Sequence, residues 1–375
     1  MANLFDYLKW RGDVPFSLDP FGEADGLLFA ELAYVDWEGV PEDGGTLGIA
    51  EARDAFFAVH TREEIEASSS WGAKAALLLD DMAEGERFRG VRIGTCFHER
   101  DEEEKVQISA VTFLPGDGSV YVAFRGTDNS LTGWREDFNM TYMEETGGQR
   151  LAIGYLNLAG SRYAGPLRVG GHSKGGNFAL YAAAYCDPAV RERICEVLSY
   201  DAPGYRREVA DSAQIAEAAG KTRRILPETA IIGRMLTCMG EETVVESAGT
   251  GIGQHDAFTW QFVRNRFVRA EESEFSKIID RVLDAWLEQL DDEARRSVLD
   301  TVFSLLEATG QDNFHSMSLQ KLKTAESLIT SVAGLPKEQR SELLQLIGKL
   351  VKSSGQTAAA FLAARRAEEN EEAQE

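Results

Sequence analysis

The first ninety residues carry apolar side chains mainly at helical spacing. Over residues 23–35 the apolar positions recur every three or four residues, which predicts a helix. The same spacing predicts helices over residues 49–59 and 62–84. Short stretches with Gly and Pro stand before and between these segments. We therefore expect the N-terminal part of the chain to be mainly helical.

The pattern changes near residue 90, where short runs rich in β-branched and aromatic residues begin. Residues 91–101, 106–115 and 119–126 each fit a strand bounded by turn residues. The sequence Pro115-Gly116-Asp117-Gly118 predicts a tight turn between the last two strands. A hairpin is therefore expected here.

Strand and helix signals alternate further along the chain. Residues 167–170, 194–200 and 243–247 are short and largely apolar, which predicts strands. Residues 177–185 are small and apolar at helical spacing, which predicts a helix after the first of these strands. Alternation of this kind favours an α/β fold with a mainly parallel central sheet flanked by helices.

Strand signals end near residue 272. Over residues 273–290 apolar side chains return every three or four positions, and later segments repeat this pattern. We expect an all-helical extension over residues 271–355, following a main domain over residues 1–270 that includes the N-terminal helices. Residues 356–375 are polar and acidic, so a partly disordered tail is expected there.

The charge excludes some classes of partner. The chain has 39 Lys and Arg residues against 62 Asp and Glu residues, a formal net charge of −23. Nucleic-acid binding depends on a basic face, so a nucleic-acid partner is not expected. Binding to an anionic membrane by charge alone is equally disfavoured. No apolar stretch of about 18 residues exists, so no transmembrane segment is expected.

The cysteines and the N-terminus indicate a cytoplasmic protein. Charged residues interrupt the first sixteen positions, where a signal peptide would be apolar. The four cysteines form no CxxC pair and no cluster with zinc spacing, so neither a metal nor another cofactor is expected. We expect these thiols to be reduced and mostly buried.

The strongest chemical signal is Gly171-His172-Ser173-Lys174-Gly175, which lies between a predicted strand and a predicted helix. This is the context of a G-x-S-x-G nucleophile elbow, in which a serine is raised on a strained turn. Gly171 and Gly175 would let strand and helix pack closely around it. A phosphate-binding loop needs Gly-Lys-Ser or Gly-Lys-Thr, whereas here the lysine follows the serine.

A serine nucleophile needs a base, and in an α/β-hydrolase the chain order is Ser, acid, His. Of the histidines after Ser173, His255 lies in a Gly-rich loop after a strand, whereas His315 lies in the helical extension. His255 is therefore the expected base. His60 and His98 precede the elbow and are out of order. The side chain of His172 is expected to point away from the base.

The acid and the oxyanion donors are assigned by their places at strand ends. Asp201 follows the strand after the elbow helix and is the first choice as acid. A turn-forming role is the alternative. The oxyanion hole would use the N–H of Lys174 and a donor from Thr127, which follows the strand before the elbow. The competing carboxylates are Glu228, Glu241 and Asp256.

These residues together resemble class 3 lipases. That family has a Phe-Arg-Gly-Thr segment after a strand, then Trp and Asp, then G-H-S-x-G-G. This chain has Phe124-Arg125-Gly126-Thr127, Trp134, Asp137 and Gly171–Gly176. It looks most similar to a bacterial lipase-like branch with a GHSKGG elbow, over roughly residues 1 to 265.

The resemblance implies an α/β-hydrolase fold and metal-free ester hydrolysis. Ser173 would be the nucleophile, His255 the base, and Thr127 with Lys174 the oxyanion donors. The family's acid lies in a later segment, which corresponds here to residues 227–233 and has no Asp, so Asp201 rests on its position alone. Lys174 stands where lipases often have Leu, which makes the expected site more polar.

Three functions follow from these observations. The first is an esterase or lipase that cleaves a small-molecule acyl ester or lipid-like substrate through a Ser173 acyl-enzyme. The second is a thioesterase or acyltransferase with the same triad. The third is a non-catalytic binding scaffold on a hydrolase fold, in which the C-terminal helices are the functional part. Those helices could also form a lid or a homo-oligomer contact.

Overall fold

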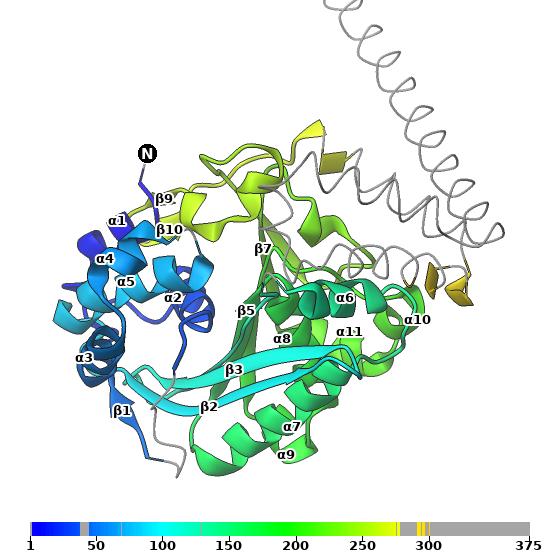
Figure 1. Ribbon diagram of the computed structural model, residues 1–375, viewed down its shortest axis with the longest axis horizontal. Helices are drawn as coiled ribbons and strands as arrows, with labels where there is room; N and C mark the ends of the chain where they lie inside the picture. Colours follow the sequence, from blue (N-terminus) through cyan, green and yellow to red (C-terminus); the bar gives the residue numbers. More distant parts are fainter. Residues whose placement is uncertain are drawn as a thin grey trace, which may run out of the picture.

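The described part of the chain is a helix-covered sheet (Figure 1). The computed structural model describes residues 2–37, 45–68, 70–128, 130–274, 276–277, 291–293, 295–296 and 300. Among these residues, no helix is long and apolar enough to cross a membrane. The helical extension predicted over residues 271–355 and the tail predicted over 356–375 lie almost entirely outside the described residues.

Eight strands form one sheet in the order in which they follow along the chain. Strands β1 to β4 pair antiparallel, and strands β4 to β8 pair parallel. A short antiparallel pair, β9 with β10, lies apart from this sheet. The strands are β1 Leu47–Gly48, β2 Arg92–Asp101, β3 Val106–Leu114, β4 Val120–Phe124, β5 Leu167–His172, β6 Ile194–Tyr200, β7 Thr222–Pro227, β8 Glu241–Val245, β9 Phe262–Val263 and β10 Arg266–Phe267.

Helices cover both faces of the sheet (Figure 1). The α-helices are α1 Leu4–Arg11, α2 Glu23–Leu32, α3 Ile49–Val59, α4 Arg62–Ala67, α5 Trp71–Glu84, α6 Leu131–Asn139, α7 Gly147–Arg162, α8 Lys174–Tyr185, α9 Pro188–Arg191, α10 Arg207–Ala210 and α11 Ala213–Ala219. Three short 3₁₀ turns follow: η1 Ile232–Arg234, η2 Gly251–His255 and η3 Ala257–Thr259.

The alternation of side chains along the strands divides the core into two layers. On β4, Tyr121 and Ala123 pack with the N-terminal helices α1, α2, α3 and α5. Val120, Val122 and Phe124 point to the opposite face and pack with α7, α8 and α11. The central strands are therefore buried on both faces, which explains their nearly continuous apolar sequence.

This architecture is an α/β-hydrolase fold, as the sequence predicts: a mainly parallel sheet with helices on both faces and a sharp turn between β5 and α8. Several elements differ from the prediction, and two of the differences have a clear cause in the sequence. The helix predicted over residues 62–84 is split into α4 and α5, because Thr61 and Ser70 each cap a separate helix N-terminus. Strand β7 was not predicted, since its sequence, TRRILP, places two arginines among the apolar residues.

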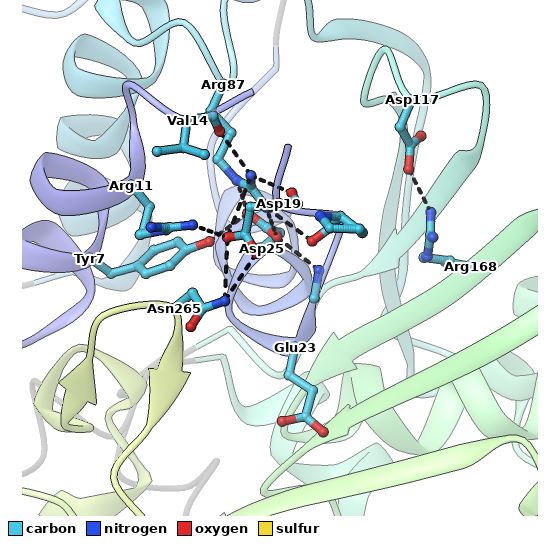
Figure 2. A network of polar contacts seen from close by, with 12 residues as sticks. Tyr7, Arg11, Val14, Asp19, Glu23, Asp25, Arg87, Asp117, Arg168 and Asn265 are labelled. Atoms are coloured by element: carbon cyan, nitrogen blue, oxygen red, sulfur yellow. Dashed lines mark hydrogen bonds and ion pairs between the residues drawn. The ribbon is translucent and has the colours of Figure 1, made fainter. Parts of the chain in front are cut away.

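A buried polar network ties the N-terminal helices to the rest of the molecule (Figure 2). Arg87 Nη2 lies 2.6 Å from Asp25 Oδ2, and both side chains are almost fully buried. The hydroxyl of Tyr7 donates to Asp25 Oδ1 at 2.7 Å, and burial raises the pKa of that tyrosine. Asn265, between β9 and β10, donates to Asp19. The segment before α2 and the turn between β9 and β10 therefore share one set of contacts.

The cysteines depart in part from expectation. None of the four, all of which lie in the described part of the chain, forms a disulfide. Only Cys186 is buried, however; Cys96 and Cys238 are half-buried and Cys195 is exposed. The expectation that most of them are buried is therefore wrong, because Cys195 lies on β6 at a position that faces solvent.

Candidate active site

Ser173 sits in a strained turn between β5 and α8. Its backbone angles are φ 57° and ψ −134°, a conformation that side-chain-bearing residues rarely adopt. Its N–H donates to the carbonyl oxygen of Tyr200 at 2.8 Å, which fixes the turn against β6. Strain of this kind persists only where the surrounding structure holds it, and it is typical of functional positions. The predicted elbow is thus present at the level of the backbone.

Two glycines make this turn sterically possible. A Cβ atom on Gly171 would lie 2.4 Å from the carbonyl carbon of Gly175. A Cβ atom on Gly175 would lie 2.0 Å from the carbonyl oxygen of Phe124. Neither position can therefore hold a larger residue without moving β4, β5 or α8. This is the close packing that the sequence pattern predicts.

Asp201 and His255 lie in direct contact. Asp201 follows β6, at the carboxyl edge of the parallel strands, and adopts a positive φ of 42°. Its Oδ2 atom lies 2.6 Å from His255 Nδ1. Its Oδ1 atom accepts a hydrogen bond from the N–H of Gly233 at 3.0 Å. The carboxylate is almost fully buried, so it holds the imidazole in one orientation.

The competing carboxylates lie elsewhere. Asp256 pairs with Lys74 Nζ at 2.6 Å. Glu228 accepts a hydrogen bond from the side chain of Gln254 at 3.2 Å. Glu241 begins β8 at the opposite end of the parallel strands from Asp201. Of the four acids considered, Asp201 is the one bonded to the ring of His255.

His172 lies beside His255, although its ring was expected to point away from it. The two ring centroids are 4.5 Å apart, and His172 Nε2 lies 2.8 Å from the carbonyl oxygen of His255. That expectation is therefore wrong: the strand end turns the fully buried His172 ring into the η2 loop. No hydrogen bond joins Ser173 to His255 among the described residues. The loop carrying His255 nevertheless packs against the residue preceding Ser173.

The Phe-Arg-Gly-Thr segment lies against the elbow. A Cβ atom on Gly126 would be 3.0 Å from the Cβ atom of Ser173. Thr127 follows directly, and its hydroxyl donates to Asp137 Oδ2. Burial raises the pKa of Asp137 to about 6. In the described part of the chain, the N–H groups of Thr127 and Lys174 donate to no acceptor.

Lys174 departs from expectation in one respect. Its side chain does not add polarity to the site, because it is fully buried and points into the protein. The ammonium group lies 2.9 Å from both Gln107 O and Gln107 Oε1 and 3.2 Å from Glu136 Oε2. It therefore connects α8 to β3 and α6. The first N–H groups of α8 remain directed toward the elbow, as in any helix N-terminus.

The structure adds residues that could not be placed from the sequence. Tyr34 donates its hydroxyl to His172 Nδ1 at 3.0 Å, and the ring of Trp71 lies 5.7 Å from that of His255. Both come from the N-terminal helical region, more than 100 residues away along the chain. Among the contacts that were missed, only that of the Lys174 side chain had a signal in the sequence. A lysine in an otherwise small and apolar helix indicates a buried partner. His60 and His98 line a neighbouring cavity, and His315 lies outside the described residues.

A sequence model of the family described as Mbeg1-like matches residues 82–304, which is more than half of the chain. No curated protein matches.

The solved structures that match this chain include two whose titles name a lipase, and the overall similarity is low. M37 lipase has 13% identity and a TM-score of 0.37, over 57% of this chain and 70% of that chain. The Rhizomucor miehei lipase propeptide complex has 14% identity and a TM-score of 0.36, over 59% and 66%. A mutant of MDLA from Penicillium cyclopium has 13% identity and a TM-score of 0.38, over 67% and 87%.

Proposed function

The chain belongs to the Mbeg1-like family, and from that premise we propose that it is a serine hydrolase that cleaves acyl esters through an acyl-enzyme. Ser173 is the nucleophile, His255 the general base and Asp201 the acid that orients the base. The observation that carries the proposal is the 2.6 Å contact between Asp201 and His255, in a loop that also contacts His172, the residue before the serine of the strained elbow.

The reaction begins when the Oγ atom of Ser173 attacks the ester carbonyl. His255 Nε2 takes the hydroxyl proton and returns it to the departing alcohol, which leaves the acyl group on Ser173. Water then attacks this acyl-enzyme while His255 takes a proton from the water. His255 passes the proton to the Oγ atom of Ser173, which releases the acid and restores the serine. Asp201 keeps the Nδ1 proton in place and stabilises the imidazolium that forms in each half-reaction.

The negative oxygen of each tetrahedral intermediate needs hydrogen-bond donors. The N–H groups of Thr127 and Lys174 have no acceptor in the described part of the chain and flank the elbow. The N-terminus of α8 adds a favourable partial positive charge. Donors fixed in this way act without reorganisation during the reaction, which is the main source of their effect on rate. Thr127 and Lys174 therefore act through their main chain in this proposal.

A fluorophosphonate probe tests the nucleophile. The folded protein should gain one label, located on Ser173 by peptide mass spectrometry. Ser173→Ala should abolish both labelling and hydrolysis of 4-nitrophenyl esters. Ser161→Ala is a matched control, because the hydroxyl of Ser161 bonds only to its own helix, at Leu158 O. Equal ester hydrolysis by the wild type and Ser173→Ala would contradict the proposal.

A series of 4-nitrophenyl esters from acetate to palmitate would then define the acyl chain. Acetyl to hexanoyl esters should be preferred if the acyl group occupies a polar cavity, and longer chains if it lies on an apolar surface. Thr127 and Trp71 line a cavity of about 920 Å³ whose wall is partly polar. We therefore expect the optimum at short chains.

A further inference from the structure

Asn177 is a buried polar side chain on the helix that begins at the proposed nucleophile. It lies one helical turn after Ser173, and only 1% of it is exposed. Most of its neighbours in the sequence of α8, KGGNFALYAAAY, are small or apolar. Burying an amide is unfavourable unless its hydrogen bonds are made, so the partners of Asn177 indicate its role.

Both donors of this amide reach the segment that follows the proposed acid. Asn177 Nδ2 donates to the carbonyl oxygens of Pro203 at 3.2 Å and of Gly204 at 2.8 Å. In the opposite direction, the hydroxyl of Tyr205 donates to the main-chain oxygen of Asn177 at 2.5 Å. These three partners follow shortly after Asp201 in the chain. The helix of the nucleophile is therefore bonded to the segment of the acid.

A second amide fixes the orientation of the first. Gln149 Nε2 donates to Asn177 Oδ1 at 2.9 Å, and Gln149 Oε1 accepts the N–H of Thr146 at 2.8 Å. Main-chain oxygens can only accept and N–H groups can only donate, so each amide in this chain of bonds has one possible orientation. The donors of Asn177 are thus held toward the acid segment by α7.

Asp201 needs support of this kind, because its backbone is strained. Its φ of 42° is rarely adopted by a residue with a side chain. Such a conformation persists only where neighbouring contacts hold it. On one side, its N–H donates to Ile225 O at 2.8 Å and its Oδ1 atom accepts the N–H of Gly233 at 3.0 Å. On the other side, Asn177 holds the residues that follow. Without these bonds the chain after Asp201 would relax, and the carboxylate would turn away from His255.

We propose that Asn177 is a positioning residue that keeps the carboxylate of Asp201 in contact with His255. The inference rests on the proposed hydrolase function and deepens it. A displacement of a catalytic group by about 1 Å can lower the rate roughly 100-fold. Because Asn177 acts on the base through its acid, its loss should lower kcat more than it changes KM.

Asn177→Asp separates the donors of this amide from its acceptor. The new carboxylate is nearly isosteric and still accepts from Gln149, but it cannot donate to Pro203 and Gly204. We expect kcat for 4-nitrophenyl butyrate to fall about 10- to 100-fold, with KM changed by less than about threefold. Gln149→Met keeps both donors of Asn177 but removes the bond that orients them, so it should lower kcat less, in the same direction.

Tyr155→Phe is the control for a loss of stability alone. Tyr155 is buried, and its hydroxyl donates to Thr95 O at 2.5 Å, in the antiparallel part of the sheet. Removing this hydroxyl leaves a buried main-chain oxygen unpaired, as Asn177→Asp does at two positions. Tyr155→Phe should lower the midpoint of urea unfolding and leave kcat unchanged.

The proton between His255 and Asp201 gives a readout that a purely structural residue would not move. A short hydrogen bond from a ring N–H to a carboxylate shifts its proton far downfield in the proton NMR spectrum, and this bond is 2.6 Å long. Asp201→Asn assigns the resonance by removing it. Asn177→Asp should shift it upfield or abolish it, whereas Tyr155→Phe should leave it in place.

Three outcomes contradict the inference in distinguishable ways. If the wild type cleaves the ester and Ser173 takes the fluorophosphonate label, but Asn177→Asp keeps the wild-type kcat and resonance, Asn177 is structural only and the hydrolase function stands. If the folded wild type neither cleaves the ester nor takes the label, the proposed function fails, and this inference fails with it. Should Asn177→Asp not fold, an unchanged kcat and resonance in Gln149→Met would contradict the inference in its place.

Discussion

His172 Nε2 lies 2.8 Å from the carbonyl oxygen of His255, so the residue before the proposed nucleophile holds the backbone of the proposed base. A carbonyl oxygen can only accept, which places the ring proton of His172 on Nε2. Its Nδ1 atom then accepts from the hydroxyl of Tyr34 at 3.0 Å. Burial lowers the pKa of His172 well below its ordinary value, which agrees with a neutral ring.

Replacing His172 should therefore affect the placement of His255. His172→Leu removes both hydrogen bonds and should lower the free energy of unfolding by about 2 kcal/mol. It should also lower kcat for a 4-nitrophenyl ester about tenfold or more, with a smaller change in KM, because the base is misplaced and substrate binding is not. His172→Gln keeps a donor near the position of Nε2 and should recover much of kcat. A Gln variant no better than Leu would contradict this role.

Replacing Asp201 should lower activity far more than replacing the other carboxylates that were considered as the acid. Asp201→Asn should lower kcat/KM on the order of 10,000-fold, because an amide cannot hold the proton of His255 on Nδ1. The fold should survive, since the Asn oxygen can still accept the N–H of Gly233. Asp256→Asn is the matched control, because Asp256 pairs with Lys74 instead. Similar losses in both variants, measured with one neutral ester, would show that the acid is wrongly assigned.

The elements that depend on local sequence could be predicted. The strained turn at Ser173 could be placed because its glycines and its strand–helix setting lie within a few residues. Asp201 and His255 could be placed because each follows a strand, and the carboxyl ends of parallel strands meet at one edge of a sheet. The contact between them is a property of the whole fold. Only the order Ser, acid, His of an α/β-hydrolase pointed to it in the sequence.

Contacts between distant segments could not be predicted. The side-chain direction of Lys174 depends on Gln107, which is 67 residues away, and on Glu136, which belongs to a different helix. The direction of the His172 ring depends on Tyr34, 138 residues away. Hydrophobic periodicity records which face of an element is buried, but not which polar group of another element meets it.

The buried pair of Lys174 and Glu136 should stabilise the junction of α8 with α6. Glu136 also accepts the N–H groups of Gln107 and Gly148, at 2.9 and 2.7 Å. Lys174→Met has nearly the same volume but leaves a buried carboxylate without its cation. We expect a loss of about 3 kcal/mol in the free energy of unfolding, measured by urea denaturation.

The double variant Lys174→Met with Glu136→Gln tests whether this loss comes from the ion pair. Removing the orphaned charge should recover part of the lost stability, so the two effects should not add. Additive losses would show that Lys174 acts through packing alone. Fluorophosphonate labelling of the double variant would report whether the N-terminus of α8 keeps its position.

Asp137 should make the protein lose stability as the pH rises from about 4 to about 6. Its pKa is raised from 3.8 to about 6, chiefly by burial, so in this range the native state holds a proton that the unfolded chain has released. The native state therefore loses up to about 3 kcal/mol across the window, and this loss remains at higher pH. Asp137→Asn should remove this dependence while keeping an acceptor for the hydroxyl of Thr127.

Urea unfolding at each pH from 4 to 8 gives the difference in the free energy of unfolding between the wild type and Asp137→Asn. This difference should grow up to pH 6 and then level off. Asp80→Asn is the control of opposite sign, because Arg62 lowers the pKa of Asp80. A difference that stays constant between pH 4 and 8 would show that Asp137 is ionised throughout.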